Sequence, residues 1–189
     1  MKIAVDVDGV ILNSIQLFIR HYNQTHKTHY TKDDITQWDF FEDWNMSEKE
    51  FYSTFYMLYE NEEAPPLIDD HIPEYLRKLN STHKVDIVSA RNPRFKRSLQ
   101  QKLKKEGICQ KEQYNNLIVV NEKPHNLKIT LNYDIYIDDN LNLIPFLVAY
   151  PQKTLLLFHQ PWNAHILLQS RNIIRVHNWL EVISYIKYL

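Results

Sequence analysis

Residues 1–12, MKIAVDVDGVIL, carry the pattern that decides the fold. Lys2 to Asp8 is short, rich in valine and isoleucine, and ends in polar residues, which is typical of a buried strand. Gly9 ends this strand, and apolar residues return at helical spacing from about Ser14. The pattern predicts a strand, a turn and a helix, which is how an α/β domain begins.

Strands and helices alternate along the second half of the chain. Short apolar strands are predicted at 84–89, 117–120, 133–138, 155–158 and 173–176, and helices at 72–79, from Asn92 to Gly107, at 143–149 and from Trp179 onward. Such alternation implies a parallel sheet that is covered by helices on both faces. We therefore expect an α/β fold with a Rossmann-like, doubly wound parallel sheet.

A segment of different character interrupts this alternation after the first strand. Residues 25–70 are rich in aromatic and acidic side chains and lack strand-like runs. Ser47 and Glu50 have the spacing of a capping box and predict a helix from about Glu48 to Tyr59. We expect residues 13–72 to form a small helical cap, inserted into a core that consists of residues 1–12 and 73–189.

The composition excludes several classes of protein. The 189 residues include 22 Lys and Arg against 23 Asp and Glu, so no basic excess indicates a nucleic-acid polymer as partner. Two glycines are too few for a Walker A loop or a GxGxxG dinucleotide fingerprint. The single cysteine, Cys109, excludes an intrachain disulfide. Because we find neither a signal-peptide pattern nor an apolar run of membrane-spanning length, we expect a cytoplasmic protein without a membrane partner.

Basic residues gather on the predicted helix that follows Asn92. They are Arg94, Lys96, Arg97, Lys102, Lys104 and Lys105. Since the formal net charge of the chain is −1, we expect these residues on a solvated outer face rather than on a nucleic-acid surface.

Chemically distinctive residues stand at three predicted strand ends. The first strand ends in Asp6-Val7-Asp8-Gly9, the second in Ser89-Ala90-Arg91, and the strand at 133–138 in Asp138-Asp139. Ligands of parallel α/β sheets bind at the carboxyl ends of the strands, so these residues are expected to converge. Alternation along a strand would place Asp6 and Asp8 on one side, where two carboxylates call for a cation between them. Oxygen ligands favour Mg²⁺.

In this order the residues resemble the motifs of the haloacid dehalogenase (HAD) superfamily. DVDGV at 6–10 is similar to the first motif, Ser89 to the second, and the Asp138-Asp139 pair to the fourth, so the resemblance covers nearly the whole chain. More narrowly, the chain resembles the 5′(3′)-deoxyribonucleotidase group. That resemblance depends on DVDGV, the compact cap, YIDDN at 136–140, FHQPWN at 158–163 and RVHNWLEV at 175–182.

The resemblance implies a Mg²⁺-dependent hydrolase of phosphomonoesters. Asp6 would be the nucleophile that takes the phosphoryl group, and Asp8 would act as the acid and the base. Mg²⁺ would be held by Asp6, the backbone carbonyl of Asp8, and Asp138, while Asp139 would support the site without touching the ion. The residues implied around the phosphoryl group are Gly9, Ser89, Ala90, Arg91 and a lysine.

Two lysines are candidates for this third motif of the superfamily. Lys128 precedes Asp138 by ten residues, and Lys123 precedes it by fifteen. The short spacing usual in the superfamily favours Lys128, whereas Lys123 directly follows a predicted strand. The ammonium has to reach both the nucleophile and the phosphate.

The sequence leaves more than one function open. The set of Asp6, Asp8, Ser89 and Asp138 favours an enzyme over a non-catalytic, ligand-binding domain of the same fold. The aromatic cap suits stacking on a base, which favours 5′ or 3′ (deoxy)nucleoside monophosphates over the alternative, a sugar phosphate or another small phosphomonoester. The candidates for base contact are Trp38, Phe40 and Trp44, each of which could instead belong to the core of the cap.

Overall fold

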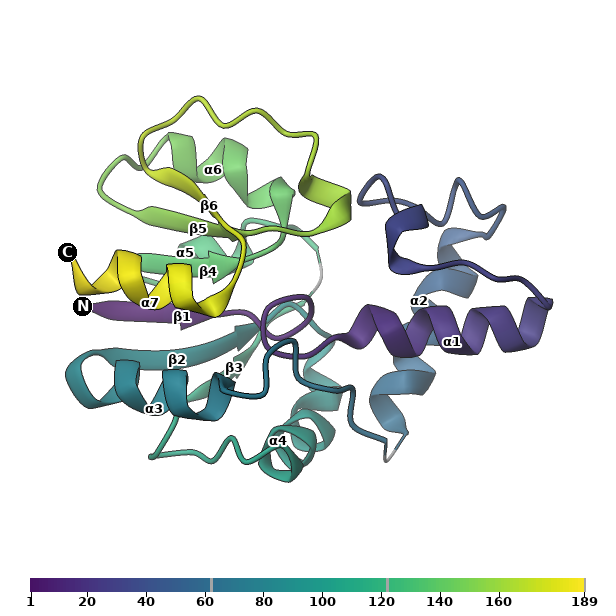
Figure 1. Ribbon diagram of the computed structural model, residues 1–189, viewed down its shortest axis with the longest axis horizontal. Helices are drawn as coiled ribbons and strands as arrows, with labels where there is room; N and C mark the ends of the chain where they lie inside the picture. Colours follow the sequence, from purple (N-terminus) through teal and green to yellow (C-terminus); the bar gives the residue numbers. More distant parts are fainter. Residues whose placement is uncertain (62, 122, 189) are drawn as a thin grey trace.

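A six-stranded parallel sheet forms the centre of the computed structural model, which describes residues 1–61, 63–121 and 123–188 (Figure 1). The strand order is β3-β2-β1-β4-β5-β6, and every neighbouring pair is parallel. The strands are β1 (Lys2–Val5), β2 (Lys84–Ser89), β3 (Leu117–Val119), β4 (Ile135–Asp138), β5 (Thr154–Phe158) and β6 (Ile173–Val176). This order confirms the predicted doubly wound, Rossmann-like sheet.

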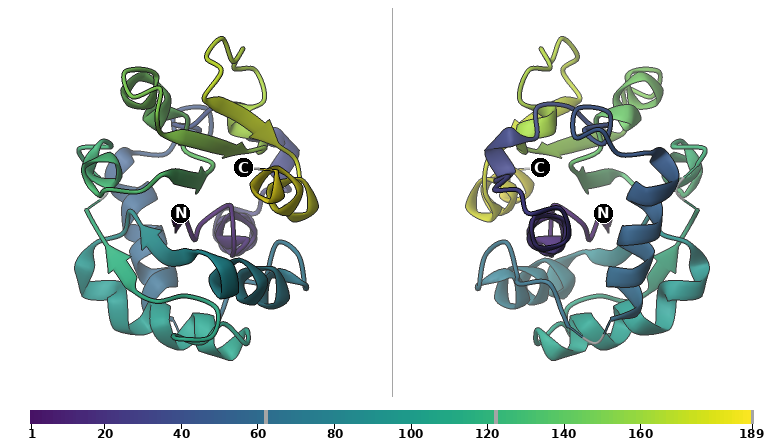
Figure 2. Two further views of the ribbon diagram at one scale, coloured as in Figure 1. Left: turned by 90° about the vertical axis from the view of Figure 1, so that its left-hand side faces the viewer. Right: turned by 90° about the vertical axis from the view of Figure 1, so that its right-hand side faces the viewer.

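Helices cover both faces of the sheet (Figure 2). One face packs against α3 (Ile72–Thr82), α4 (Lys96–Lys105) and α7 (Trp179–Lys187), and the other against α5 (Leu127–Thr130) and α6 (Ile144–Val148). The alternation of a strand decides which residues serve which face: Ile3 and Val5 of β1 pack in the first core, and Ala4 packs in the second. Among the helices that the structure describes, none has the length and apolar character to cross a membrane.

Element ends differ from the predictions where a local turn intervenes. β1 ends at Val5 rather than Asp8, because the chain turns back and the amides of Ile11 and Leu12 donate to the carbonyl of Val7. The predicted helix after Asn92 begins as a 3₁₀ turn, η2 (Pro93–Phe95), and continues as α4. Gly107 follows α4 with a left-handed φ of +76°, as its position predicts.

The segment between β1 and α3 projects from the carboxyl end of the sheet (Figure 1). It contains α1 (Ser14–His26), the 3₁₀ turn η1 (Lys32–Asp34) and α2 (Glu48–Glu60). Ser47 caps α2 by accepting a hydrogen bond from the amide of Glu50, which confirms the predicted capping box at its N-cap side. We call residues 14–60 the insertion; the boundaries 13 and 72 of a separate cap domain stay a prediction.

The insertion has an aromatic core of its own, in which Phe18 of α1 stacks on Phe55 of α2 with ring centroids 4.6 Å apart. Two connecting segments join it to the sheet side by side, because the amide of Asn13 donates to the carbonyl of Pro66 at 2.8 Å. Two further 3₁₀ turns, η3 (Leu141–Leu143) and η4 (Pro161–Asn163), follow β4 and β5.

Candidate active site

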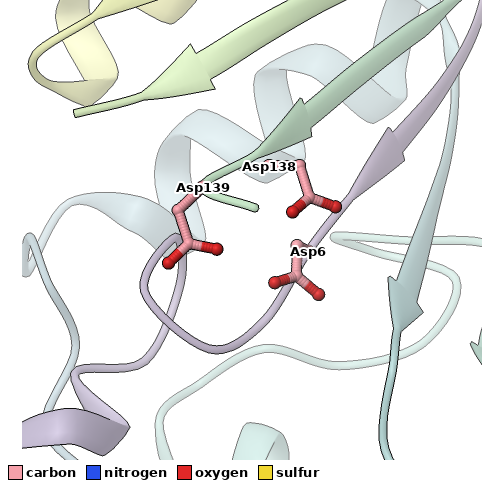
Figure 3. Close-up of side chains that lie close together, drawn as sticks. All are labelled: Asp6, Asp138 and Asp139. Atoms are coloured by element: carbon pink, nitrogen blue, oxygen red, sulfur yellow. The ribbon is translucent and has the colours of Figure 1, made fainter. Parts of the chain in front are cut away.

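The reversal of strand order between β1 and β4 brings the predicted strand-end residues together. The amide of Asp6, directly after β1, donates to the carbonyl of Ile137 in β4 at 2.9 Å. Asp138 is the last residue of β4, and Ser89 is the last residue of β2 on the other side of β1. Figure 3 shows the carboxylates of Asp6, Asp138 and Asp139 turned toward one another at this edge.

Three carboxylates and one ammonium form the buried centre of the site. Asp6, Asp138 and Asp139 each present an oxygen within 4.8 Å of the others, and their exposed fractions are 7%, 2% and 4%. Lys128 Nζ lies 2.7 Å from Asp6 Oδ1 and 2.6 Å from Asp138 Oδ2. Despite burial, these two carboxylates raise the pKa of Lys128.

Three buried carboxylates share one ammonium, and ionisation of Asp6 and Asp139 is correspondingly disfavoured. Burial, helped by Asp138 and Asp8, raises the pKa of Asp6 to about 7 although Lys128 opposes the shift. Burial and the charge of Asp6 raise the pKa of Asp139 well above its usual range. Three carboxylates with one lysine leave negative charge among hard oxygen donors, and this donor set fits a divalent cation such as Mg²⁺.

Asp138 and Asp139 have different surroundings. Asp138 is engaged at both oxygens, since Oδ2 accepts from Lys128 and Oδ1 accepts from the amide of Asn140 at 3.0 Å. The Asp139 carboxylate instead lies against Gly9, where a built Cβ would collide with it. Asp139, expected to support the site from outside, therefore presents an oxygen to the same cluster as Asp138 does.

The turn after β1 is held in place by the segment that follows β5. Gln160 Nε2 donates to the carbonyl of Gly9 at 2.6 Å, and Asn163 Nδ2 donates to the carbonyl of Asp139 at 2.9 Å. Arg175 of β6 donates to Asn163 Oδ1 at 2.8 Å. The first two hydrogen bonds are buried and the third is partly buried, and together they fix the backbone next to two of the carboxylates.

Asp8 is paired with Arg91 rather than with the cation cluster. Arg91 Nε lies 2.7 Å from Asp8 Oδ2, Arg91 Nη2 lies 2.5 Å from Oδ1, and the hydroxyl of Ser14 also donates to Oδ1. Burial opposes ionisation, but Arg91 and Ser14 outweigh it and lower the pKa of Asp8. Because β1 ends before Asp6, strand alternation does not describe the two acids, and each of them has its own cation: Lys128 for Asp6 and Arg91 for Asp8.

The remaining predicted phosphate-site residues lie around the same centre. Ser89 is fully buried, and its Oγ has no hydrogen-bond partner among residues 1–61, 63–121 and 123–188. Gly9 and Ala90 line the cavity described below. Lys123 lies elsewhere: its ammonium pairs with Glu48 at 2.8 Å on the surface, so Lys128 is the lysine that reaches the carboxylates.

A cavity of about 160 Å³ opens above these residues. Asp6, Asp8, Asp139 and Lys128 line its base, and its apolar wall comes largely from the insertion, namely Trp38, Phe40, Phe51, Tyr52, Phe55, Tyr56 and Tyr59. A void of about this size holds one benzene-sized ring. Of the three base-contact candidates, Trp38 and Phe40 line the cavity. Trp44 does not; it stacks on Tyr30 with centroids 4.2 Å apart and belongs to the core of the insertion.

Several residues of the site were not among the predicted site residues. His125, Asn140 and Trp162 line the cavity, and Gln160 and Asn163 support it. The position of HQPWN (159–163) directly after β5 was the available signal, since strand ends in such sheets carry function. The expectation that Lys102 is solvated was wrong: it is 3% exposed because its ammonium donates to the carbonyl of Leu58 in α2 at 2.7 Å.

Solved structures of HAD hydrolases share this fold. A hydrolase of the haloacid dehalogenase-like family from Streptococcus pneumoniae, SP0104, is 14% identical with a TM-score of 0.62, and the match covers 98% of this chain and 97% of that one. A predicted phosphoglycolate phosphatase from Haemophilus somnus 129PT is 15% identical with a TM-score of 0.63, covering 97% and 96%. The magnesium-bound HAD hydrolase YfnB from Bacillus subtilis is 17% identical with a TM-score of 0.56, covering 97% of both chains.

The fold and the acidic strand ends agree with a match over residues 1–189 to a family of 5′ nucleotidases, and together these findings show a hydrolase of the HAD superfamily, of the phosphatase and nucleotidase class. The chain belongs to the family described as 5′ nucleotidase, deoxy (pyrimidine), cytosolic type C protein, whose profile matches residues 1–189. Among curated proteins it is 23% identical over 190 residues to YqfW of Bacillus subtilis (strain 168), whose name proposes a nucleotidase. That match covers 98% of this chain and 93% of YqfW.

Proposed function

We propose that this protein is a Mg²⁺-dependent nucleotidase that hydrolyses (deoxy)nucleoside monophosphates through an aspartyl phosphate on Asp6. One observation carries the proposal: the Asp6 carboxylate, with Lys128 at 2.7 Å, lies at the base of a cavity whose wall is aromatic. A phosphate bound at the bottom of the cavity would leave the nucleobase among the aromatic rings. Stacking there is favourable for any nucleobase.

The donor set of the site supports Mg²⁺ as the cofactor. Asp6 and Asp139 would hold the ion together with the backbone carbonyl of Asp8, and Asp138 would contribute an oxygen or orient Lys128. When bound, the ion would neutralise charge on the phosphoryl oxygens. The negative charge that Lys128 leaves unbalanced is the feature of this chain that supports a divalent ion.

The residues of the chain account for both halves of the reaction. An oxygen of Asp6 attacks phosphorus, the ester P–O bond breaks, and the leaving oxygen takes a proton from Asp8. Water then attacks phosphorus, the bond from phosphorus to Asp6 breaks, and Asp8 takes the proton from water. Asp8 loses this proton to solvent when phosphate leaves, because Arg91 and Ser14 outweigh burial and lower its pKa, and the negative charge of the next bound phosphate favours its protonated form again.

The phosphoryl oxygens need donors at the same place. Lys128 supplies a fixed ammonium, and the buried Oγ of Ser89 is a donor whose partner would be the substrate. Arg91 Nη1 is also buried and has no hydrogen-bond partner among the described residues, so it can donate to phosphate beside the Asp8 pair. Gly9 and Ala90 line the cavity and would approach the phosphate through their backbone.

The names of the relatives support a nucleotide as substrate. The family description names a deoxy, pyrimidine and cytosolic enzyme, and YqfW is named as a nucleotidase. We extend these attributes to this chain as a proposal, including cytoplasmic residence, which agrees with its single cysteine.

A side-by-side measurement tests the proposal. We expect kcat/KM for dUMP, dTMP and AMP to exceed that for a hexose phosphate, and turnover to vanish when EDTA removes divalent metal and to return with Mg²⁺. If kcat/KM for the hexose phosphate exceeds that for the nucleotides by about tenfold or more, the nucleotidase proposal is wrong and only the phosphatase class remains. No turnover of any phosphomonoester with Mg²⁺ would contradict the catalytic proposal.

A further inference from the structure

Arg91 is in an unusual position for an arginine, because only 1% of it is exposed. Two of its nitrogens donate hydrogen bonds to the two oxygens of Asp8: Nε to Oδ2 at 2.7 Å, and Nη2 to Oδ1 at 2.5 Å. A carboxylate offers about four acceptor positions in total. Arg91 occupies two and Ser14 a third, which leaves one position, on Oδ2, to accept a proton. The pair therefore fixes the plane of the Asp8 carboxylate and the oxygen through which it can act.

The insertion completes the surroundings of the guanidinium. Its central carbon lies 4.0 Å from the ring centroid of Tyr59, which is on α2. The same end of α2 is attached to the core by the Lys102 ammonium on the carbonyl of Leu58 and by Phe95, whose ring centroid is 5.4 Å from that of Tyr59. Docking of α2 on the core thus places an aromatic face on Arg91.

We propose that Arg91 is a positioning residue that orients Asp8 to accept the proton of water, and that Tyr59 makes this orientation depend on the docked insertion. The proposal rests on the proposed function, because it concerns hydrolysis of the phosphoryl group carried by Asp6. In that step water adds to phosphorus, the bond from phosphorus to Asp6 breaks, phosphate leaves, and the water proton moves to Asp8. Arg91 neither gives nor takes a proton.

The substitution Arg91→Lys separates this role from charge alone. Lysine keeps the positive charge but loses the paired N–H groups and the flat surface that stacks on Tyr59. With p-nitrophenyl phosphate the leaving group needs no protonation, so formation of the phosphoenzyme stays fast and only its hydrolysis is slowed. We expect kcat to fall by about tenfold or more, with a burst of nitrophenolate and phosphoenzyme visible in the intact mass after acid quench.

Tyr59 provides a second, milder test that leaves the Arg91–Asp8 pair chemically intact. Tyr59→Leu should slow hydrolysis by about two- to fivefold and produce the same burst, whereas Tyr59→Phe keeps the ring and should remain closer to the wild type. Arg94→Lys is the matched control, because Arg94 also stacks on an insertion ring, that of Tyr56, but its side chain is 55% exposed. It should not change the burst.

The outcomes are distinguishable. A lower kcat for Arg91→Lys without phosphoenzyme would overturn the proposal. A raised KM at unchanged kcat would also overturn it, because it would show that Arg91 acts only through its contact with the phosphate and does not position Asp8. Thermal unfolding shows whether Arg91→Lys folds, and if it does not, Tyr59→Leu decides. If the wild type itself hydrolyses no p-nitrophenyl phosphate with Mg²⁺, the proposed function fails first, and the inference with it.

Discussion

Gly9 and Asp139 share one small volume at the edge of the sheet. Gly9 has a left-handed φ of +78°, and a Cβ built on it would collide with the Asp139 carboxylate and come within 3.3 Å of the Trp162 ring. The two residues follow different strands, β1 and β4. The missing side chain at Gly9 therefore decides where the Asp139 carboxylate lies.

Gly9→Ala should weaken metal binding as well as the fold. A Cβ at this position strains a left-handed backbone and pushes Asp139 away from Asp6. We expect Mg²⁺ affinity, measured by calorimetry, to fall by about tenfold or more. Gly107→Ala is the matched control: φ is +76° there too, but the nearest atom to a Cβ is Pro73 Cγ at 3.9 Å. It should cost about 1 kcal/mol of stability and leave metal affinity unchanged. Equal metal affinity in both variants would contradict this account.

Asp6→Asn should abolish turnover while the protein remains folded. An amide cannot form the acyl phosphate and is a poor ligand for Mg²⁺, so we expect a loss of at least about a hundredfold in kcat with nucleoside monophosphates. Circular dichroism should match the wild type. Asp70→Asn, an exposed residue outside the site, serves as the control and should retain full activity. Residual activity above about a few per cent in Asp6→Asn would remove Asp6 as the nucleophile.

Asp139→Asn should lose more metal affinity than Asp138→Asn. The oxygens of Asp138 already accept hydrogen bonds from Lys128 and from the amide of Asn140. Burial and the neighbouring carboxylates instead raise the pKa of Asp139, so its ionised form needs a cation beside it. Mn²⁺ titration followed by electron paramagnetic resonance measures this without turnover. The resemblance to the superfamily motifs implies the opposite order, and a larger loss for Asp138→Asn would support that order.

Lys102 should make stability depend on pH above neutrality. Burial and the nearby charge of Arg91 lower the pKa of Lys102 to about 8, against 10.5 for an ordinary lysine. Between these values the unfolded chain binds more protons than the folded one, so the contribution of Lys102 to the unfolding free energy rises with pH from about 8 to 10.5. We expect Lys102→Met to lack this rise in urea unfolding.

The control for Lys102 is Lys104→Met, because Lys104 is exposed on the same helix. It should follow the wild type at every pH. The pH values 7.5 and 10.5 enclose roughly the range between the folded and the unfolded pKa of Lys102. If the wild type and Lys102→Met differ by the same unfolding free energy at both, the lysine does not titrate as expected.

Trp38→Leu should lower kcat/KM for nucleotides more than for a hexose phosphate, which has no aromatic ring that could stack on Trp38. Trp38 lines the cavity, and loss of one stacking partner costs about 1–3 kcal/mol per base. We expect a decrease of about fivefold or more for dUMP, mostly in KM, and a smaller one in Trp38→Phe. Equal losses for the two substrates would show that Trp38 shapes the cavity without contacting the base.

Local sequence was sufficient for the order of the elements. β2 and β6 have their predicted bounds, and Ser47 caps α2 as predicted, because apolar periodicity and capping depend on residues that are near one another in the chain. The same holds for the convergence of Asp6, Ser89 and Asp138, since all carboxyl ends of a parallel sheet share one edge.

The partners of the charged side chains were decided by the tertiary structure. Arg91 meets Asp8, Lys128 meets Asp6, and Lys102 reaches a carbonyl of the insertion, although each pair is far apart in sequence. Composition predicts only that charges prefer water. Burial changes that preference, because a charge inside the protein must find a partner, and only the packing of β1, β4, α2 and α4 determines which partner is within reach.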